Sequence, residues 1–327
     1  MSSFHFESTC PNNPPPAKDF LPVLNDVIKV LEKEDVTIRP EAAKKKSGGL
    51  IYLIKGIPTV IVPDLHSRYD FLVRILNYKL SASTILEMLE KGLVNLLFVG
   101  DGLHSERAGF ERWQLAYDDF LDGIFNGKSM TEEMSLGLNL MFLVMKLKIA
   151  FPKNVHFLKG NHENILNSED NGNFPFRKFV DEGVMTLEFM KSTYPKKLIK
   201  AYACFENHLP IFAIGSDFLV SHAEPVHYFS KDEILNCYRN PSAITGFIWT
   251  GNGEALNEPA IKLLSEYFPD NPSSLYFAGH RPVKDRFALR EDGRFVQIHN
   301  PDKKQIFVIN PDDAKNFEEG IIDLDEV

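Results

Sequence analysis

The sequence predicts a single domain of the α/β class, and three observations support this prediction. The chain has 327 residues, of which 44% are hydrophobic, so it can bury a large core. Segments with helical periodicity occur together with short β-branched runs that are typical of buried strands. No linker interrupts this apolar pattern, so we expect one domain although the length alone would allow two.

Composition divides the chain into three parts. Residues 1–20 are predicted to form an extended arm, because four prolines and two asparagines lie within residues 10–17. Residues 21–312 hold the periodic apolar segments and form the predicted domain. Residues 313–327 make up an acidic tail that we expect to be poorly ordered.

Helical periodicity is clearest in two segments of the first half, residues 110–125 and the long apolar run 134–150. Ser129 and Glu132 form a capping box that is expected to start the second of these helices. Because this helix is apolar nearly all round, we expect it to be buried deeply. Further helices are expected over residues 18–35, 69–80 and 83–92, and strands over residues 49–54 and 58–63.

The second half is predicted to contain mostly strands. Two of the connections between them are short turns, "EDGR" and "NPDKK", which indicate antiparallel pairing late in the chain. The strands are expected over residues 154–159, 209–214, 217–222, 274–279, 286–291, 294–299 and 305–310.

Charge and composition exclude several classes of function. The net charge of −9 argues against an extended nucleic-acid-binding surface, although cations bound in a site can reverse the local field. No apolar run is long enough for a membrane span, and the N-terminus does not resemble a secretory signal. Cys10, Cys204 and Cys237 are an odd number without paired spacing, so we expect reduced thiols in a cytoplasmic protein.

One pattern occurs five times along the chain: a buried strand ends directly in side chains that bind metals. Because strands of one sheet bring their ends together, these side chains are expected to surround one point. Each could also be structural if taken alone, as a turn aspartate or a hydrogen-bonded histidine, but the joint pattern is harder to explain that way. The predicted ligands are Asp64, His66, Asp101, Asn161, His222 and His280.

The chemistry of this set indicates two metal ions. Three imidazoles, two carboxylates and one amide oxygen suit Mn, Fe, Zn or similar divalent ions. Six ligands are too many for one ion that keeps an open position, but they suit two ions that share a carboxylate and lie about 3.5–4 Å apart. Such a pair can bind a phosphoryl group and convert a bridging water to hydroxide.

The motifs that carry these ligands resemble a known family. "PDLHS", "GDGLHSE", "GNHEN", "SHAEP" and "GHRP" stand in the order of the motifs of the calcineurin-like metallophosphoesterases, and are most similar to the bacterial-type phosphoprotein-phosphatase branch. The likeness runs from about residue 57 to residue 282. It implies a four-layer α/β/β/α sandwich with a dinuclear metal site at the strand ends.

The resemblance also implies a role for each residue of the site. It assigns Asp64, His66 and Asp101 to one ion, and it makes Asp101 the ligand that bridges to the second ion. The second ion would also be held by Asn161, His222 and His280. His162 resembles the catalytic histidine of the family, which can protonate the leaving oxygen because the ordinary imidazole pKa lies near neutrality.

Some positions depart from the family's motifs. Pro63, Ser67, Ala223 and Glu224 stand where the family usually has glycine. These side chains are expected to crowd the mouth of the site, which favours a narrower range of substrates.

The largest departure lies in the second motif, where the family has GDxxDRG. The positions of its second aspartate and its arginine hold His104 and Ser105. We predict that a carboxylate, Glu106, approaches the site from further along the loop, whereas in the alternative His104 itself supports His162. Neither alternative is decided by the sequence.

Three arginines are candidates for binding the substrate phosphate, because a guanidinium can bind phosphate through two hydrogen bonds. Arg107 is favoured, and Arg68 and Arg281 compete for the same role because both lie beside predicted metal ligands. Arg239 is a more distant candidate that is expected on the surface.

The function predicted from these features is hydrolysis of a phosphomonoester, in a phosphoprotein or a small phosphorylated molecule, with a metal-bridging hydroxide as nucleophile and His162 as acid. One alternative is a nucleotide or dinucleoside-polyphosphate hydrolase or a phosphodiesterase, which the same metal pair would support. A second alternative is a non-catalytic scaffold, although such a chain should have lost ligands that this one keeps.

Overall fold

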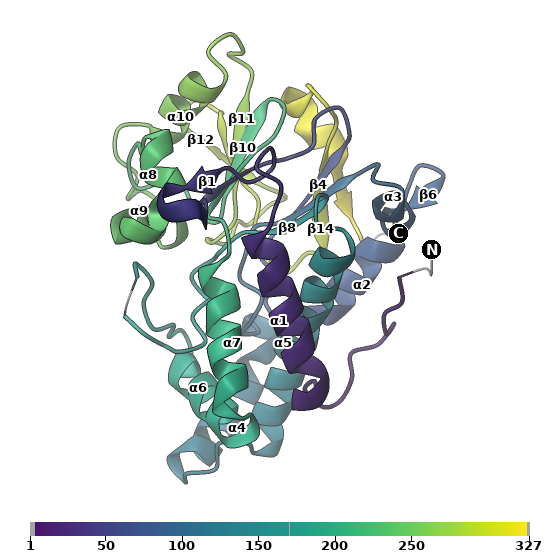
Figure 1. The fold of residues 1–327 in the computed structure, drawn as a ribbon, viewed down its shortest axis with the longest axis vertical. Helices are drawn as coiled ribbons and strands as arrows, with labels where there is room; N and C mark the ends of the chain where they lie inside the picture. Colours follow the sequence, from purple (N-terminus) through teal and green to yellow (C-terminus); the bar gives the residue numbers. More distant parts are fainter. Residues whose placement is uncertain (1–3, 170, 326–327) are drawn as a thin grey trace.

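The computed structural model of the protein describes residues 4–169 and 171–325 and shows a four-layer α/β/β/α sandwich. Two sheets lie face to face, one group of helices covers the outer face of the first sheet, and a second group covers the second (Figure 1). This is the architecture that the motifs implied.

The first sheet has five strands in the order β15-β14-β4-β7-β8. The neighbouring strands β4, β7 and β8 run parallel, so their carboxyl ends meet at one end of the sheet. β14 is antiparallel to both β4 and β15. The bounds are β4 Thr59–Val62, β7 Asn95–Phe98, β8 Val155–Phe157, β14 Gln305–Ile309 and β15 Ile321–Asp323.

The second sheet has six strands in the order β12-β13-β11-β10-β9-β3. β10, β11 and β13 run parallel, whereas β9 is antiparallel to β10 and β12 is antiparallel to β13. The bounds are β3 Leu50–Tyr52, β9 Phe212–Ile214, β10 Phe218–Ser221, β11 Leu275–Ala278, β12 Ala288–Arg290 and β13 Phe295–Gln297.

Three apolar layers hold the sandwich together. Within β4, Val60 and Val62 pack against the helices, whereas Ile61 points into the layer between the two sheets. This alternation follows from the pleat of a strand, and because both faces of each sheet are covered, the strands read as nearly continuous apolar runs. The third layer lies between the second sheet and its helices.

Ten helices belong to the described part of the chain. Those on the first sheet are α1 Ala17–Glu32, α2 Tyr69–Asn77, α3 Ile85–Glu90, α4 Phe110–Leu121, α5 Lys128–Ala150, α6 Glu182–Thr193 and α7 Lys196–Asn207. Those on the second are α8 Lys231–Leu235, α9 Pro241–Ile248 and α10 Pro259–Tyr267. Smaller elements are the ribbons β1 Glu41–Ala42 with β2 Lys46–Ser47 and β5 Lys79–Leu80 with β6 Ser83–Thr84, and the 3-10 turns Ala43–Lys45, Arg107–Gly109, Cys237–Arg239 and Ala314–Gly320.

The long helix α5 is buried on most of its surface, as its composition predicted, because it packs against α1, α2, α4, α6 and β8. Its predicted capping box is wrong. The helix begins at Lys128 after Gly127, and no side chain caps it, since Ser129 already lies in its first turn. Within the residues that the structure describes, no helix combines the length and the apolar character that crossing a membrane requires.

The structure of both chain ends differs in part from what their composition predicted. The helix α1 begins at Ala17, and the preceding arm lies against α5, where Ser135 and Asn139 donate hydrogen bonds to backbone carbonyls of the arm. In the acidic tail, residues 314–323 form a 3-10 turn and the edge strand β15, because β15 covers the open edge of β14.

One predicted strand pairing is also wrong. The turn "EDGR" does join the antiparallel strands β12 and β13, but the segment "NPDKK" carries the chain from β13 in the second sheet to β14 in the first. β14 pairs with β4 and β15, and all five of its residues are buried there. Helices α6 to α10 were not expected from the sequence.

A buried charge network ties the segment that follows α1 to α5. The carboxylate of Glu34 lies 2.6 Å from the Lys148 ammonium and 3.0 Å from the Arg39 guanidinium, and all three side chains are buried. Burial opposes the negative charge of Glu34, but the attraction of Lys148, Arg39 and His156 outweighs it and lowers the pKa of Glu34 to about 2.

We expect Glu34→Gln to lower the free energy of unfolding by about 3–5 kcal/mol near neutral pH, because it leaves buried cations without a partner. The Glu34 pKa is lower in the folded chain than in the unfolded chain, so its contribution is present above the unfolded value and is lost as the pH falls towards 2. Urea unfolding at several pH values measures this. The exposed Glu32 provides the matched control Glu32→Gln, and equal effects of the two variants would contradict the prediction.

Candidate active site

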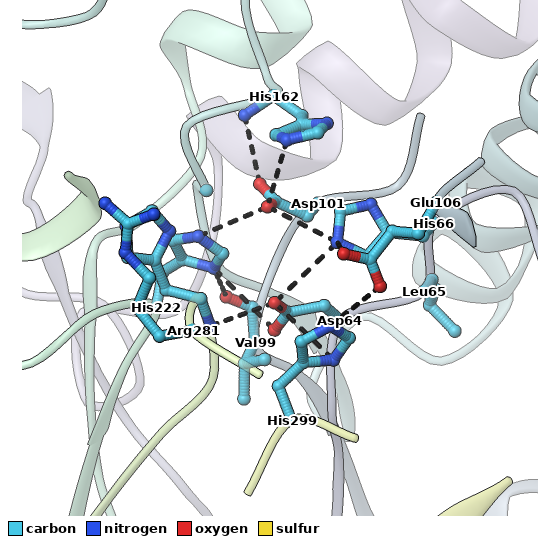
Figure 2. A network of polar contacts seen from close by, with 12 residues as sticks. Asp64, Leu65, His66, Val99, Asp101, Glu106, His162, His222, Arg281 and His299 are labelled. Carbon is cyan, nitrogen blue, oxygen red and sulfur yellow. Dashed lines mark hydrogen bonds and ion pairs between the residues drawn. The ribbon is translucent and has the colours of Figure 1, made fainter. Parts of the chain in front are cut away.

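The predicted ligands meet at the carboxyl ends of five strands, as Figure 2 shows for most of them. Residues after β4, β7 and β8 of the first sheet face residues after β10 and β11 of the second. Their ligand atoms form three overlapping groups, in each of which all atoms lie within 4.8 Å of one another. The groups are Asp64 with His66 and His299, His66 with Asp101 and His162, and Asp101 with His222 and His280.

Asp101 lies at the centre of this arrangement (Figure 2). Its Oδ2 is 3.4 Å from His222 Nε2, 3.6 Å from His162 Nε2 and 3.8 Å from His66 Nε2. Its Oδ1 accepts a hydrogen bond from the backbone N–H of His162 at 3.0 Å. The carboxylate therefore belongs to two of the groups and has the position that a bridging ligand needs.

Hydrogen bonds fix the orientation of the imidazoles. His66 Nδ1 lies 3.0 Å from the carbonyl of His104, and His222 Nδ1 lies 3.0 Å from the carbonyl of Val99. A carbonyl can only accept, so Nδ1 carries the proton in both rings and Nε2 presents its lone pair to the site. Asn161 Oδ1 lies 3.0 Å from both His222 Nε2 and His280 Nδ1, which places the amide oxygen beside the same point.

The backbone is unusual where these ligands stand. His66, Asp101, His104 and His280 all have positive φ, with values of 41°, 52°, 66° and 64°. Residues other than glycine rarely adopt this backbone conformation, and such strain is concentrated at functional sites. Gly279 is also required, because a Cβ there would collide with the Asp64 carboxylate.

Glu163, which follows His162, stabilises the backbone of the loops that carry the predicted ligands. Its buried carboxylate accepts hydrogen bonds from the backbone N–H groups of Asp101 at 3.0 Å, Gly102 at 2.9 Å and Gly160 at 2.7 Å. It therefore ties the loop after β7 to the loop after β8 and holds the Asp101 backbone in place.

The electrostatics of the site favour bound cations. Burial, together with the nearby Glu106, raises the pKa of Asp64 to about 6, and burial together with Glu163 and Asp64 raises that of Asp101 well above its usual value. Burial lowers the pKa of His66 to about 3, so its ring is neutral. Among the described residues, Asp64 Oδ1 and His299 Nδ1 are buried without a hydrogen-bond partner. Neutral imidazoles, crowded carboxylates and unpartnered buried atoms fit divalent metal ions.

His162 lies next to the predicted ligands and in contact with His104. The two Nδ1 atoms are 3.1 Å apart, and His104 Nε2 lies 2.9 Å from the hydroxyl of Thr186. Phe176 covers both rings, with its centroid 3.6 Å from that of His162. Burial and the neighbouring imidazoles lower the pKa of His162 well below its usual value, so the ring is neutral in the free site rather than titrating near neutrality.

The structure places Glu106 in the site, but beside other partners than His162. Its Oε2 accepts a hydrogen bond from His299 Nε2 at 2.9 Å, and its Oε1 lies 2.7 Å from the ammonium of Lys178 and 3.7 Å from His66 Nε2. The side chain with a ring nitrogen within hydrogen-bond distance of His162 is His104. Of the two residues that we considered as partners of His162, His104 therefore contacts it, whereas Glu106 lies in the site and orients His299 instead.

His299 is the site residue that sequence reasoning missed. It is fully buried, and its Nδ1 lies 3.7 Å from Asp64 Oδ2. The signal was present, since His299 follows the apolar strand β13 just as the other histidines follow theirs. The motifs end earlier in the chain, so the pattern was not followed as far as β13.

None of the predicted phosphate-binding arginines reaches the centre of the site. Arg68 donates hydrogen bonds to the backbone carbonyls of Leu65, Asp64 and Lys303, which occupy its guanidinium. Arg107 is 85% exposed and lies near Asp302, 3.9 Å away. Arg281 is exposed, with its guanidinium near Gly251. Arg239 lies outside the site, in the turn Cys237–Arg239, where it packs over Tyr238.

A cavity of about 780 Å³ lies beside the site. It is lined by His66 and Glu106 at one end and also by residues 8–10 of the N-terminal arm, together with Arg107 and Arg112. A group larger than phosphate therefore has room next to the predicted ligands.

Comparisons with known proteins identify the family and a similar fold. Residues 57–302 match the model of the family described as calcineurin-like phosphoesterase. A protein serine/threonine phosphatase from Saccharomyces cerevisiae with similarity to human phosphatase PP5 is 13% identical, covers 94% of this chain and 89% of its own, and has a TM-score of 0.56. A cold-active protein-tyrosine phosphatase of a psychrophilic Shewanella is 13% identical over 80% of this chain and 77% of its own, with a TM-score of 0.40. No curated protein matches the sequence.

Proposed function

Because the chain belongs to the calcineurin-like phosphoesterase family, and so is a phosphatase-type hydrolase of phosphoric esters, we propose that it hydrolyses phosphomonoesters with two divalent metal ions. The observation that carries this proposal is the position of Asp101, whose Oδ2 lies between His66 Nε2 at 3.8 Å and His222 Nε2 at 3.4 Å, and so between the ligands of the two proposed ions. One carboxylate shared by two groups is what a dinuclear centre requires.

We assign the side chains of the site to the two ions as follows. Asp64, His66 and His299 would hold the first, and Asn161, His222 and His280 would hold the second. Asp101 would be shared, because its Oδ2 lies 3.8 Å from His66 Nε2 of the first set and 3.4 Å from His222 Nε2 of the second. Oxygen and imidazole ligands without thiolate favour Mn, Fe or Zn. When bound, such ions would polarise the phosphoryl oxygens and lower the pKa of a water between them.

The remaining chemistry falls to His162. Its Nε2 lies 3.6 Å from Asp101 Oδ2, so the ring reaches the region where the leaving oxygen of a bound ester would stand. We propose that it donates a proton to that oxygen, and the negative charge of the bound phosphate favours the protonated ring. His104 would hold the orientation of His162 through the contact between the two Nδ1 atoms.

A panel of substrates tests this function. With Mn²⁺ added, the protein is expected to hydrolyse p-nitrophenyl phosphate and a phosphoserine peptide much faster than bis(p-nitrophenyl) phosphate or a dinucleoside polyphosphate. Preference for the diester or the polyphosphate would favour the phosphodiesterase or nucleotide-hydrolase alternative. No turnover of any member, together with fewer than two bound ions, would favour a non-catalytic scaffold.

We expect His299→Ala to weaken the binding of one of the two ions by about 10- to 100-fold, because it removes a buried ring nitrogen that faces Asp64. Metal content after dialysis against limiting Mn²⁺ measures this directly. The control is His227→Ala, which removes an exposed histidine outside the site. Unchanged metal content in His299→Ala would show that His299 is not a ligand.

A further inference from the structure

The sequence predicted an arginine for the substrate phosphate, but none of the three predicted arginines reaches the centre of the site. Arg68 is committed to three backbone carbonyls, and Arg107 and Arg281 are exposed. A different cation, Lys178, lies against the site, with its ammonium 2.7 Å from Glu106 Oε1. The same Glu106 oxygen is 3.7 Å from His66 Nε2, so the ammonium stands next to the first group of predicted metal ligands.

Lys178 belongs to the segment between His162 and α6, and this segment is anchored at several points. The buried carboxylate of Glu182 accepts hydrogen bonds from the backbone N–H groups of Lys178 at 2.9 Å and Phe179 at 2.6 Å. Further back, Asn173 accepts a hydrogen bond from the indole of Trp249 at 2.8 Å. The backbone of Lys178 is therefore fixed, while its side chain remains 40% exposed and can change partner.

The same segment also carries Phe176, which packs on His162 at 3.6 Å between ring centroids. Phe176 and Lys178 are two residues apart, so one short stretch of backbone covers the proposed acid with one side chain and brings an ammonium beside the metal ligands with the other. A phosphoryl group bound between His162 and His66 would lie within reach of both.

We propose that Lys178 binds a non-bridging oxygen of the substrate phosphoryl group, in place of an arginine. The inference rests on the proposed function, since it concerns the phosphate of that reaction. On binding, the ammonium exchanges Glu106 Oε1 for a phosphate oxygen, and Glu106 keeps its hydrogen bond to His299 through Oε2. A lysine is suited to this exchange because its ammonium is a compact charge on a flexible stem.

Titration of the Mn²⁺-loaded protein with inorganic phosphate by calorimetry tests this proposal without any turnover. Lys178→Met is expected to weaken phosphate binding by about 10- to 100-fold, the amount that one hydrogen bond to a charged group contributes. Lys178→Arg keeps the charge and should retain most of the affinity. The neighbouring Arg177 is 78% exposed and paired with Asp181, so Arg177→Met removes a charge close by without removing the contact and should leave phosphate affinity unchanged.

Two controls separate direct contact from an indirect effect. Metal content must stay the same in Lys178→Met, so that weaker phosphate binding is not caused by a lost ion. In the Glu106→Gln background, Lys178→Met should still weaken phosphate binding, whereas a role exerted only through Glu106 would leave no further effect. Phosphate affinity that is equal in wild type and Lys178→Met, or equally reduced in Arg177→Met, would overturn the proposal.

The test of Lys178 can fail while the proposed function is confirmed, because the two are judged on different measurements. Hydrolysis of monoesters is judged on the wild-type protein alone, whereas the role of Lys178 is judged on phosphate binding. A wild-type protein that hydrolyses monoesters while Lys178→Met binds phosphate normally would leave the proposed function intact and overturn this inference. A wild-type protein that binds no phosphate would also overturn it.

Discussion

Replacing Asp101 with asparagine is expected to reduce the rate of monoester hydrolysis on the order of 10³-fold or more. The amide has one oxygen in place of two and no charge, so it cannot serve both of the ligand groups that share this side chain. Its N–H₂ would instead face His222 Nε2 or the backbone N–H of His162, both of which now lie near carboxylate oxygens. We also expect the bound metal to fall below two ions per chain.

The measurement compares p-nitrophenyl phosphate turnover and metal content in wild type, Asp101→Asn and Asp118→Asn. Asp118 is an exposed aspartate of α4 outside the site, so its change should affect neither quantity. Thermal unfolding of wild type and Asp101→Asn, both without metal, checks that the variant is folded. Retention of both ions and of turnover in Asp101→Asn would remove the central argument for a shared ligand.

Removing the imidazole of His162 is expected to reduce the rate by about 10²- to 10⁴-fold, the usual contribution of an acid or base in catalysis, without loss of metal. The effect should depend on the leaving group. An alkyl phosphate such as phosphoserine needs a proton on its leaving oxygen, whereas p-nitrophenolate leaves without one. His162→Ala should therefore slow the peptide substrate much more than p-nitrophenyl phosphate, and equal losses on both would argue against a role as acid.

His104 enters the same experiment as a positioning residue. His104→Ala should cause a smaller loss than His162→Ala, because it removes one of the two partners of His162 Nδ1 and leaves the Leu103 carbonyl in place. The double variant should be no slower than His162→Ala alone, since His104 would act through His162. Additive losses would show that His104 acts on the substrate by a separate route.

The sequence predicted the parts of this structure that depend on local pattern. Strands β4, β7, β8, β10 and β11 are short apolar runs, and each is followed within four residues by a predicted ligand. Because the strands within each sheet run parallel there, the positions at their ends were bound to meet. The convergence of Asp64, Asp101 and His222 follows from that local pattern.

The partners of these residues could not be predicted, because they depend on contacts between distant segments. His104 is held by Thr186 of α6, and Glu106 by His299 and by Lys178. No spacing rule connects these positions, which lie 72 to 193 residues apart. The predicted role of the arginines in phosphate binding was not supported for a similar reason. No local signal showed that the guanidinium of Arg68 would donate hydrogen bonds to backbone carbonyls.

The same limit explains the two errors of fold. The capping box at Ser129 satisfied a local rule, but α5 begins one residue earlier, at Lys128, so Ser129 lies inside its first turn. The short connection before β14 suggested a hairpin with β13, but β14 crosses to the first sheet and pairs with β4, a strand more than 240 residues earlier in the chain. That pairing depends on tertiary contacts that no local signal reveals.

The central claim is that two metal ions held around Asp101 perform the hydrolysis, and stepwise metal titration tests it most directly. Metal-free protein is titrated with Mn²⁺ while bound metal and p-nitrophenyl phosphate turnover are recorded on the same samples. We predict binding that saturates at two ions per chain, with turnover that rises mainly with the second ion and is abolished by a chelator. Full turnover with one ion or none, or turnover that survives chelation, would contradict the claim.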